Sequence, residues 1–300
     1  MGRRIPAWSS QFTPDALQSI DVGSPVDRIS WEEAFGGSTG KGIKVAVVDS
    51  GIEATHTALQ GSVQGYVAFQ KVGEEIIAST EPHGDESGHG TACAGIIRAI
   101  APDCELYSVK VLGSGTVGQG VIFVEGLRWA IANGIQVCNL SLGTTRKEFF
   151  AALHEVTDLA YFHHMVLITA ANNYPIPSFP SMYAAVISVA AHDEQDAYRF
   201  YYNPAPPVEF GALGIGVRVA WKNNQWIIAT GNSFAAPHIT GIVTKLLGNH
   251  PHLTPFQVKT ALRALAANAV HVDRRCRAEA GRETPEAEPS PPVYKREGSL

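Results

Sequence analysis

The sequence has no hydrophobic run long enough to cross a membrane. A transmembrane helix needs about 18 or more consecutive apolar residues, and no stretch of the 300-residue chain approaches that length. The first ten residues, MGRRIPAWSS, also lack the apolar segment of about 7–15 residues found in a secretory signal. We therefore expect no membrane partner and a cytoplasmic location.

Cysteine is scarce, and neither sign of charge dominates. The four cysteines, Cys93, Cys104, Cys138 and Cys276, are widely spaced and match neither a disulfide framework nor a zinc motif, which favours free thiols. The formal net charge is −5, and lysine and arginine are scattered along the chain, so we expect no nucleic-acid partner. Apolar residues make up 45% of the chain, which indicates a globular protein with a sizeable core.

Short apolar runs alternate with helical patterns over much of the chain. The runs are rich in β-branched residues and predict buried strands at residues 43–48, 106–112, 135–140, 165–170 and 186–190. Residues 118–133 predict a helix that ends at Asn133-Gly134. Strands that are apolar throughout and alternate with helices predict an α/β fold with three layers, in which helices cover both faces of a mainly parallel central sheet.

The later part of the chain has a different composition. Asn223-Asn224 lies between two short apolar runs and predicts a hairpin. Helices are expected at residues 234–247 and after Thr254-Pro255, which has a capping residue followed by proline. From residue 271 the sequence is rich in proline and charge, and we expect a disordered tail over residues 271–300. The folded domain is expected at residues 30–270, after an N-terminal extension over residues 1–29.

Three segments carry a polar residue where the chain leaves or enters a predicted element. Asp49 ends a buried strand in Val-Val-Asp-Ser-Gly-Ile, and His89 lies between two glycines at the start of a helical run. Ser233 precedes a helix in Gly-Asn-Ser-Phe-Ala-Ala-Pro. Each residue alone has an ordinary explanation, such as a turn for Asp49, a surface or capping role for His89, and an N-cap for Ser233.

Together these segments closely resemble the Asp, His and Ser motifs of the subtilisin family, in that family's chain order. The resemblance covers roughly residues 30–268. It implies a subtilisin-like peptidase domain that cleaves peptide bonds in protein or peptide substrates. It also implies a catalytic triad of Asp49, His89 and Ser233. An α/β-hydrolase is not favoured, because its Gly-x-Ser-x-Gly elbow is missing.

The resemblance implies further site residues. Ser141, Leu142 and Gly143 resemble the family segment that pairs with the substrate backbone and lines the specificity pocket. Asn173 resembles the oxyanion asparagine, although Asn-Asn-Tyr-Pro is also typical of a turn. Cys93 follows His89 by four residues, and in some family members a cysteine at this position packs beneath the catalytic histidine. We expect Cys93 to be a small buried residue and not a nucleophile.

The sequence departs from the family pattern at three positions. Asn232 replaces the usual threonine before the serine, and its amide can donate a hydrogen bond as a threonine hydroxyl does. Asn172 replaces a glycine, and asparagine tolerates left-handed backbone better than most residues. Ala58 stands where the family's strongest calcium site needs a carboxylate, so we expect that site to be lost. No cofactor is expected to be required, no metal ligands are identified, and calcium binding elsewhere stays open.

Two questions about regulation and function have alternative answers at this point. Residues 4–7, Arg-Ile-Pro-Ala, resemble a short extension that lies across the active site in intracellular family members. This extension predicts inhibition in cis, and the alternative is an ordinary unstructured terminus. The competing function is a catalytically weak homologue that binds peptides in the same cleft, a reading favoured by Asn232 and Asn172. No oligomeric state is indicated.

Overall fold

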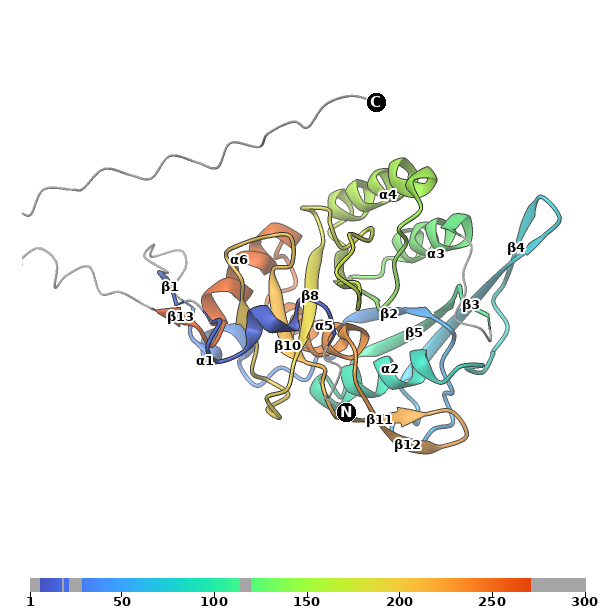
Figure 1. Ribbon diagram of the computed structural model, residues 1–300. Coiled ribbons are helices and arrows are strands. Elements are labelled where there is room, and N and C mark those ends of the chain that lie inside the picture. The colour runs from blue at the N-terminus through green and yellow to red at the C-terminus, as the bar shows by residue number, and fades with distance from the viewer. Residues whose placement is uncertain (1–5, 18, 22–28, 114–119, 271–300) are drawn as a thin grey trace, which may run out of the picture.

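A nine-stranded sheet runs through the centre of the protein (Figure 1). The computed structural model describes residues 6–17, 19–21, 29–113 and 120–270. The strand order is β4-β3-β5-β2-β6-β7-β8-β10-β9. The pairs at the two ends, β4 with β3 and β9 with β10, are antiparallel, and every pair between them is parallel. The strands are β2 (Lys44–Asp49), β3 (Val63–Val72), β4 (Glu75–Ser79), β5 (Glu105–Lys110), β6 (Val137–Leu140), β7 (Val166–Ala170), β8 (Ile187–His192), β9 (Tyr201–Tyr202) and β10 (Phe210–Leu213).

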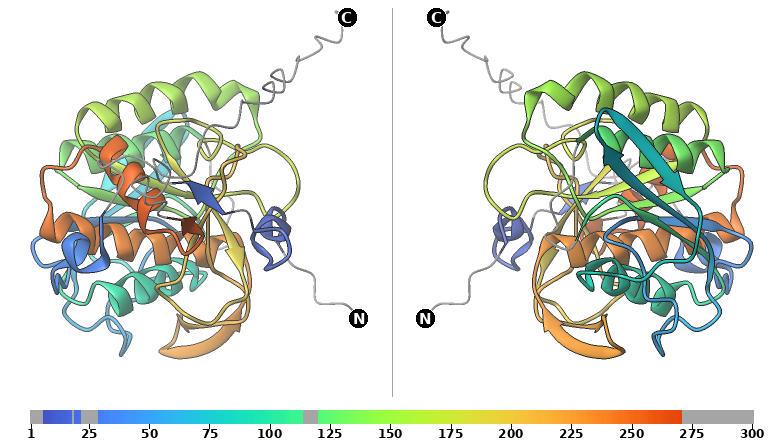
Figure 2. Two further views of the ribbon diagram at one scale, coloured as in Figure 1. Left: turned by 90° about the vertical axis from the view of Figure 1, so that its left-hand side faces the viewer. Right: turned by 90° about the vertical axis from the view of Figure 1, so that its right-hand side faces the viewer.

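Helices cover both faces of this sheet, which confirms the predicted three-layer α/β fold. On one face lie α2 (His89–Ile100) and α5 (Asn232–Asn249), and on the other lie α3 (Gly120–Ala132) and α4 (Phe150–Phe162) (Figures 1 and 2). The short helix α1 (Trp31–Phe35) packs against α5, and α6 (Pro255–Leu265) packs against β7 and β9. The predicted helices at 118–133, 234–247 and after Thr254-Pro255 are confirmed.

The five predicted strands correspond to β2, β5, β6, β7 and β8, all of which lie inside the sheet. In β2, Val45 and Val47 belong to one buried apolar cluster, whereas Ala46 and Val48 belong to the other. A central strand therefore needs apolar side chains on both of its faces, which explains the continuous apolar runs in the sequence.

The predicted hairpin around Asn223-Asn224 is also present. It joins β11 (Val217–Trp221) to β12 (Gln225–Ala229), and both asparagines have positive φ angles, 60° and 53°. Two consecutive left-handed residues are the mark of a type I′ turn, in which asparagine is favoured. The Glu53 carboxylate accepts hydrogen bonds from the backbone N–H groups of both residues and holds the turn.

Part of the N-terminal extension packs on the domain. A 3-10 helix, η1 (Ser9–Phe12), places the buried Phe12 ring against Gly211, where a Cβ atom would lie 2.3 Å from the ring. Farther along, β1 (Ile20–Asp21) pairs in parallel with β13 (Ala269–Val270). Residues 1–5, the expected disordered tail at 271–300 and Cys276 lie outside the described residues. No helix in the described ranges is both long and apolar enough to cross a membrane.

Candidate active site

The predicted site residues meet at the carboxyl edge of neighbouring central strands. Asp49 is the last residue of β2, Ser141 follows β6, and Asn173 lies shortly after β7. His89 and Ser233 come from the first turns of α2 and α5, two helices that pack against each other. The carboxyl edge of a parallel sheet is the usual position of ligands and reacting groups in α/β proteins.

Asp49 and His89 form a buried acid–base pair. The Nδ1 atom of His89 lies 2.9 Å from each carboxylate oxygen of Asp49, which is fully buried, while the imidazole keeps some exposure. Burial alone lowers the pKa of His89, but the charge of Asp49, the hydrogen bond to it and the charge of Asp85 together raise that pKa above its ordinary value of 6.5. The arrangement orients the imidazole and stabilises its cation.

Glycine at two positions lets the start of α2 pack closely against its neighbours. Gly88, the residue before the helix, has a φ of 94°, and a Cβ there would lie 2.7 Å from the Trp221 ring. At Gly90 a Cβ would lie 2.1 Å from the carbonyl oxygen of Gly51. Because a side chain at Gly90 would push the helix away from the end of β2, this glycine places His89 beside Asp49, while Gly88 leaves room for the Trp221 ring of β11.

Ser233 is held between α5 and the segment after β6. Its Oγ atom donates to the carbonyl oxygen of Ser141 at 3.2 Å, and the Ser141 hydroxyl donates to the carbonyl oxygen of Ser233 at 2.9 Å. The ring of the next residue, Phe234, lies 5.5 Å from the His89 ring between centroids. In the described part of the chain no hydrogen bond joins Ser233 Oγ to His89, so the serine hydroxyl lies in the site but is directed to Ser141.

The Asn173 side chain is oriented by the residue before Ser233. Its Oδ1 atom accepts a hydrogen bond from the backbone N–H of Asn232 at 2.9 Å, which leaves its Nδ2 group as a donor. That Nδ2 atom lies 3.6 Å from the position of a Cβ on Gly231, close to the start of α5. The N–H groups in the first turn of a helix have no acceptor within the helix. The site therefore offers an amide donor beside the N-terminal end of α5.

Asn232 itself is directed away from the site. Its buried Nδ2 group lies 3.1 Å from the carbonyl oxygens of Ala7, Ala171 and Asn172, and its Oδ1 atom accepts from the backbone N–H of Ala191. The amide does donate hydrogen bonds, as expected, and their acceptors are backbone carbonyl groups of the N-terminal segment and of the segment before Asn173. Asn172 does not take the left-handed backbone that the sequence left open, and its side chain accepts from the N–H of Tyr174.

Cys93 packs under the acid–base pair. Its Sγ atom lies 3.3 Å from Ser141 Oγ and 4.0 Å from an Asp49 carboxylate oxygen. Burial, together with the charge of Asp49, raises the pKa of this thiol well above its ordinary value. A buried, protonated thiol is a poor nucleophile and a small apolar side chain.

The three residues predicted to bind substrate have different surroundings. The Ser141 side chain contacts Ser233, and Leu142 packs on the core beneath α3 and α4. A Cβ on Gly143 would lie 3.1 Å from the carbonyl oxygen of Phe179. The neighbouring Thr144 exchanges two backbone hydrogen bonds with Phe179. The short segment after Asn173 therefore returns directly against Gly143.

Two residues in the site were missed by sequence reasoning. Ser50 follows Asp49, and its hydroxyl lies 3.1 Å from an Asp49 oxygen and 2.8 Å from an Asp85 oxygen. Asp85 is buried four residues before His89. In the sequence this aspartate lies in His-Gly-Asp-Glu-Ser-Gly, a composition that is typical of an exposed turn and carries no signal of burial.

The residues near Ala58 do not fit a calcium site. Calcium requires six to eight oxygen ligands, several of them carboxylates. The Ala58 carbonyl oxygen instead accepts a hydrogen bond from the Arg98 guanidinium at 2.8 Å. In the described residues, the one cluster of three or more His, Cys, Asp or Glu side chains with suitable ligand spacing is Asp49, His89 and Cys93. It includes a thiol and an imidazole, which calcium does not prefer.

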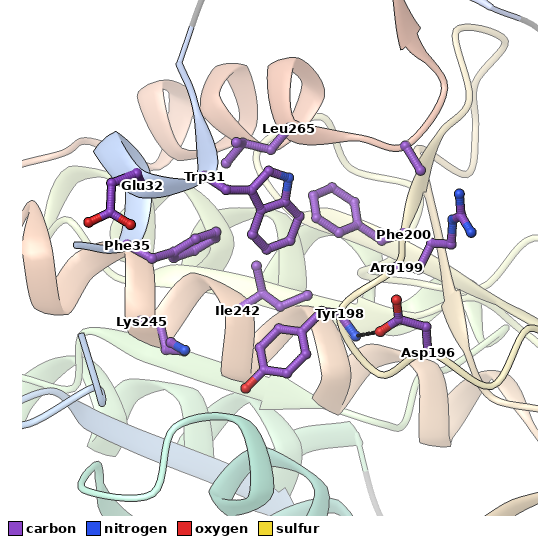
Figure 3. A pocket seen from close by; sticks show the side chains of 11 residues that line it. Trp31, Glu32, Phe35, Asp196, Tyr198, Arg199, Phe200, Ile242, Lys245 and Leu265 are labelled. Carbon is purple, nitrogen blue, oxygen red and sulfur yellow. Dashed lines mark hydrogen bonds between the residues drawn. The ribbon is translucent and has the colours of Figure 1, made fainter. Parts of the chain in front are cut away.

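A separate aromatic pocket lies between α1 and α5, away from these residues (Figure 3). Trp31, Phe35, Tyr198 and Phe200 contribute its rings. The Lys245 ammonium lies 5.1 Å from the centre of the Tyr198 ring and 6.0 Å from that of Phe35, within reach of a cation–π interaction. The chain's own cation therefore already lies against these aromatic faces.

The chain is similar in sequence to known proteins. The sequence model of the Subtilase family matches residues 40–281. The chain is 30% identical to Subtilisin DY of Bacillus licheniformis over 84% of its own length and 93% of that protein. It is 32% identical to the Minor extracellular protease Epr of Bacillus subtilis (strain 168), over 85% of its length but only 38% of that relative.

Solved structures show the same fold. A structure described as a cold adapted subtilisin-like serine proteinase has a TM-score of 0.62 at 21% identity, covering 81% of this chain and 88% of that one. One described as S41 Psychrophilic Protease has a TM-score of 0.64 at 25% identity, covering 75% and 83% of the two chains.

Proposed function

The chain belongs to the Subtilase family, whose members are serine-type endopeptidases, and we propose that it hydrolyses peptide bonds with Asp49, His89 and Ser233 as its triad. The observation that carries the proposal is the His89 Nδ1–Asp49 carboxylate pair at 2.9 Å, formed next to a serine in the first turn of α5. Protein or peptide substrates are implied by this chemistry.

Each group in the proposed mechanism has one task. Ser233 Oγ leaves its bond to Ser141 and attacks the scissile carbonyl carbon, while His89 Nε2 takes the hydroxyl proton. The new C–O bond gives a tetrahedral oxyanion, which accepts hydrogen bonds from Asn173 Nδ2 and the Ser233 backbone N–H. His89 then gives its proton to the leaving amine, the C–N bond breaks, and an acyl-enzyme remains. Water hydrolyses the ester by the same proton route.

A fluorophosphonate probe tests the proposal directly. The probe forms a covalent bond with an activated serine, so we expect it to label the protein once, at Ser233. Labelling should be lost in Ser233→Ala and His89→Ala but kept in Ser79→Ala, a matched change at an exposed serine. Absence of labelling in wild-type protein that is shown to be folded would argue against the proposal.

One observation favours the second candidate, a weak homologue that binds peptides without cleaving them. Ser233 Oγ donates to Ser141 and is not bonded to His89. If this bond persists when a peptide is bound, the nucleophile stays unactivated. The same probe separates the two candidates, because a folded, peptide-binding protein that resists labelling would support the second.

We also propose that the N-terminal segment inhibits in cis. Ala7 N–H donates to the Asn173 carbonyl oxygen at 2.8 Å, and its carbonyl oxygen accepts from Asn232. Pro6 and Trp8 line a cleft together with Asn173 and other residues. These contacts place the segment against Asn173, the proposed oxyanion donor, and so support inhibition at this end of the site. A variant lacking residues 1–10 should hydrolyse a small fluorogenic peptide faster, and an unchanged rate would count against inhibition.

Calcium independence and location are further proposals. Because Arg98 binds the Ala58 carbonyl oxygen, we expect activity to survive chelation with EGTA. Loss of activity on chelation, with recovery on adding calcium, would indicate another calcium site. The described cysteines are buried free thiols, which is compatible with a cytoplasmic location. Fractionation of cells that express the full-length protein would test this.

A further inference from the structure

Asp85 is a buried carboxylate that accepts five hydrogen bonds in the loop between β4 and α2. One oxygen accepts from the backbone N–H groups of Ser87 and Gly88 and from the Ser50 hydroxyl, at 2.8–3.0 Å. The other accepts from the N–H and hydroxyl of Thr91, at 2.8 and 2.7 Å. All five partners are donors, which is the pattern of an ionised carboxylate. Three of these donors are backbone N–H groups at the start of α2, the helix that begins with His89.

The Ser50 hydroxyl connects Asp85 to the acid–base pair. Its oxygen accepts from Ser87 Oγ at 2.9 Å and from the Gly90 N–H at 3.2 Å. It has one proton to donate, and two carboxylates are within reach, Asp85 at 2.8 Å and Asp49 at 3.1 Å. A hydroxyl has a single donor hydrogen, so a bond to Asp85 leaves the Asp49 carboxylate without that donor.

We propose that Asp85 is a positioning residue of the catalytic site, which fixes the first turn of α2 and draws the Ser50 proton away from Asp49. The Asp49 carboxylate then directs its negative charge to the His89 Nδ1–H, where it stabilises the imidazolium formed during reaction. Asp85 itself contacts neither the imidazole nor the nucleophile through any described hydrogen bond. The inference rests on the proposed function, since it concerns the base of that same reaction.

Removing the Asp85 charge has two effects on His89, both of the same sign. The negative charge that helps to raise the His89 pKa is lost, and the Ser50 hydroxyl becomes free to donate to Asp49 and partly neutralise it. Both changes lower the pKa of His89 and weaken it as a base. The acid limb of the activity profile should therefore move to lower pH, while the maximal rate falls.

Other titratable groups near this helix do not compete with Asp49 and Asp85. Cys93 on α2 has a raised pKa. Burial lowers the pKa of His83, which precedes Asp85 in the same loop, and His238 on α5 has a pKa lowered to about 4, so all three groups are uncharged near neutral pH. The remaining charged groups on the surrounding elements are paired, stacked or distant: Lys110 with Glu86, Lys222 with the Glu86 carbonyl oxygen, Arg218 over Trp226 and Arg98 at the far end of α2.

The test compares Asp85→Asn with Thr91→Val in the full-length protein. Asn is nearly isosteric but loses the charge and has one acceptor oxygen in place of two. Val removes a hydroxyl bond to Asp85 but leaves the charge. With a fluorogenic peptide, we expect Asp85→Asn to lower kcat by about 10- to 100-fold, the scale of a misplaced catalytic group. KM should stay within about two-fold, and the acid limb should move to lower pH. Thr91→Val should leave the limb in place. The inference would be overturned if the acid limb of the pH profile did not move in Asp85→Asn or moved equally in Thr91→Val. It would also be overturned if Asp85→Asn changed only KM.

A double-mutant cycle with Ser50→Ala tests the route. If Asp85 acts through the Ser50 proton, Asp85→Asn should lower kcat less in the Ser50→Ala background than in the wild type. Equal effects in both backgrounds would reject that route. Should Asp85→Asn fail to fold, Ser50→Ala must leave the His89 pKa unchanged, because the Ser50 proton is donated to Asp85 and not to Asp49. A raised His89 pKa in Ser50→Ala would show that Ser50 donates to Asp49 and would overturn the inference.

Direct titration of His89 by NMR separates this inference from the proposed function. The imidazole resonances report its pKa without turnover, so they can be followed even if no peptide is cleaved. A lower His89 pKa in Asp85→Asn would support the inference in that case, although the proposed protease activity would have failed. An unchanged His89 pKa in an active protein would reject the inference and leave the protease function intact.

Discussion

Replacing Gly90 with alanine tests how α2 is held against the end of β2. A Cβ at this position would lie 2.1 Å from the Gly51 carbonyl oxygen and 3.2 Å from the Asp49 Cβ. Real Cβ atoms are essentially never found within 3.0 Å of such neighbours, so the first turn of α2 has to move by about 0.9 Å. His89 moves with this turn, while Asp49 stays on β2.

The expected loss of activity is larger than the expected loss of stability. Overpacking at a buried position costs about 1–3 kcal/mol, and alanine recovers up to about 1 kcal/mol through its better helix propensity. By contrast, a shift of about 1 Å in a catalytic group can lower the rate about 100-fold. We therefore expect Gly90→Ala to lower kcat/KM by roughly two orders of magnitude, while the free energy of unfolding falls by about 1–2 kcal/mol.

The assay is hydrolysis of a fluorogenic peptide at 25 °C, with thermal unfolding measured on the same samples. Gly84→Ala is the matched control, because a Cβ there has no neighbour within 4 Å and the residue has no positive φ. The control should keep wild-type activity within about two-fold. Wild-type kcat/KM in Gly90→Ala would refute the reasoning, since it would mean that the helix can move without disturbing the acid–base pair.

Three further predictions concern groups around the site. His89 must be neutral to accept a proton, and its pKa is raised above 6.5. The value of kcat/KM should therefore rise with pH and reach half of its plateau above pH 6.5. A midpoint of the kcat/KM profile below pH 6.5 would contradict the Asp49–His89 geometry. Asn232→Thr removes the donor to the Ala7 and Ala171 carbonyl oxygens, so it should lower the free energy of unfolding by about 1–3 kcal/mol. Denaturant unfolding measures this change, and an unchanged unfolding midpoint would show that these hydrogen bonds contribute little to stability. Cys93 should resist iodoacetamide at pH 8 in the native protein and react only after unfolding, as followed by mass spectrometry; rapid native labelling would show an accessible thiolate.

The central sheet could be predicted from sequence because burial on both faces leaves a local record. Central strands such as β2 are apolar at successive positions, and no distant contact is needed to recognise them. The antiparallel hairpin of β3 and β4 has no such continuous apolar pattern in its sequence. All five residues of β4 are exposed, and β3 mixes exposed with partly buried positions, so neither has a continuous apolar pattern.

The positions of Asp49, His89 and Ser233 relative to the helices and strands could also be predicted, because each lies at the end or start of an element that the sequence predicts. The contacts that orient them were not. The substrate-binding role expected for Ser141 stays a prediction. Its side chain donates to the Ser233 carbonyl oxygen, a contact with α5 that no local pattern in the sequence indicates. Asp85 was missed because its burial depends on Ser50 and Thr91, whose positions follow from the packing of α2 on β2.

The N-terminal segment shows why some substitutions need the structure before they can be interpreted. Asn232 was recognised as a departure from the family pattern, but its partners are Ala7, more than 200 residues earlier, and the backbone before Asn173. The asparagine amide donates through its nitrogen and accepts from the Ala191 N–H through its oxygen. A threonine hydroxyl has one proton and a single oxygen, so it could not donate to several of these carbonyl oxygens at once. The asparagine therefore links the N-terminal segment to the domain, because its amide supplies a donor to Ala7 next to the proposed oxyanion site. A departure beside Ser233 is therefore compatible with the proposed catalysis, since its side chain serves a contact that the usual residue does not make.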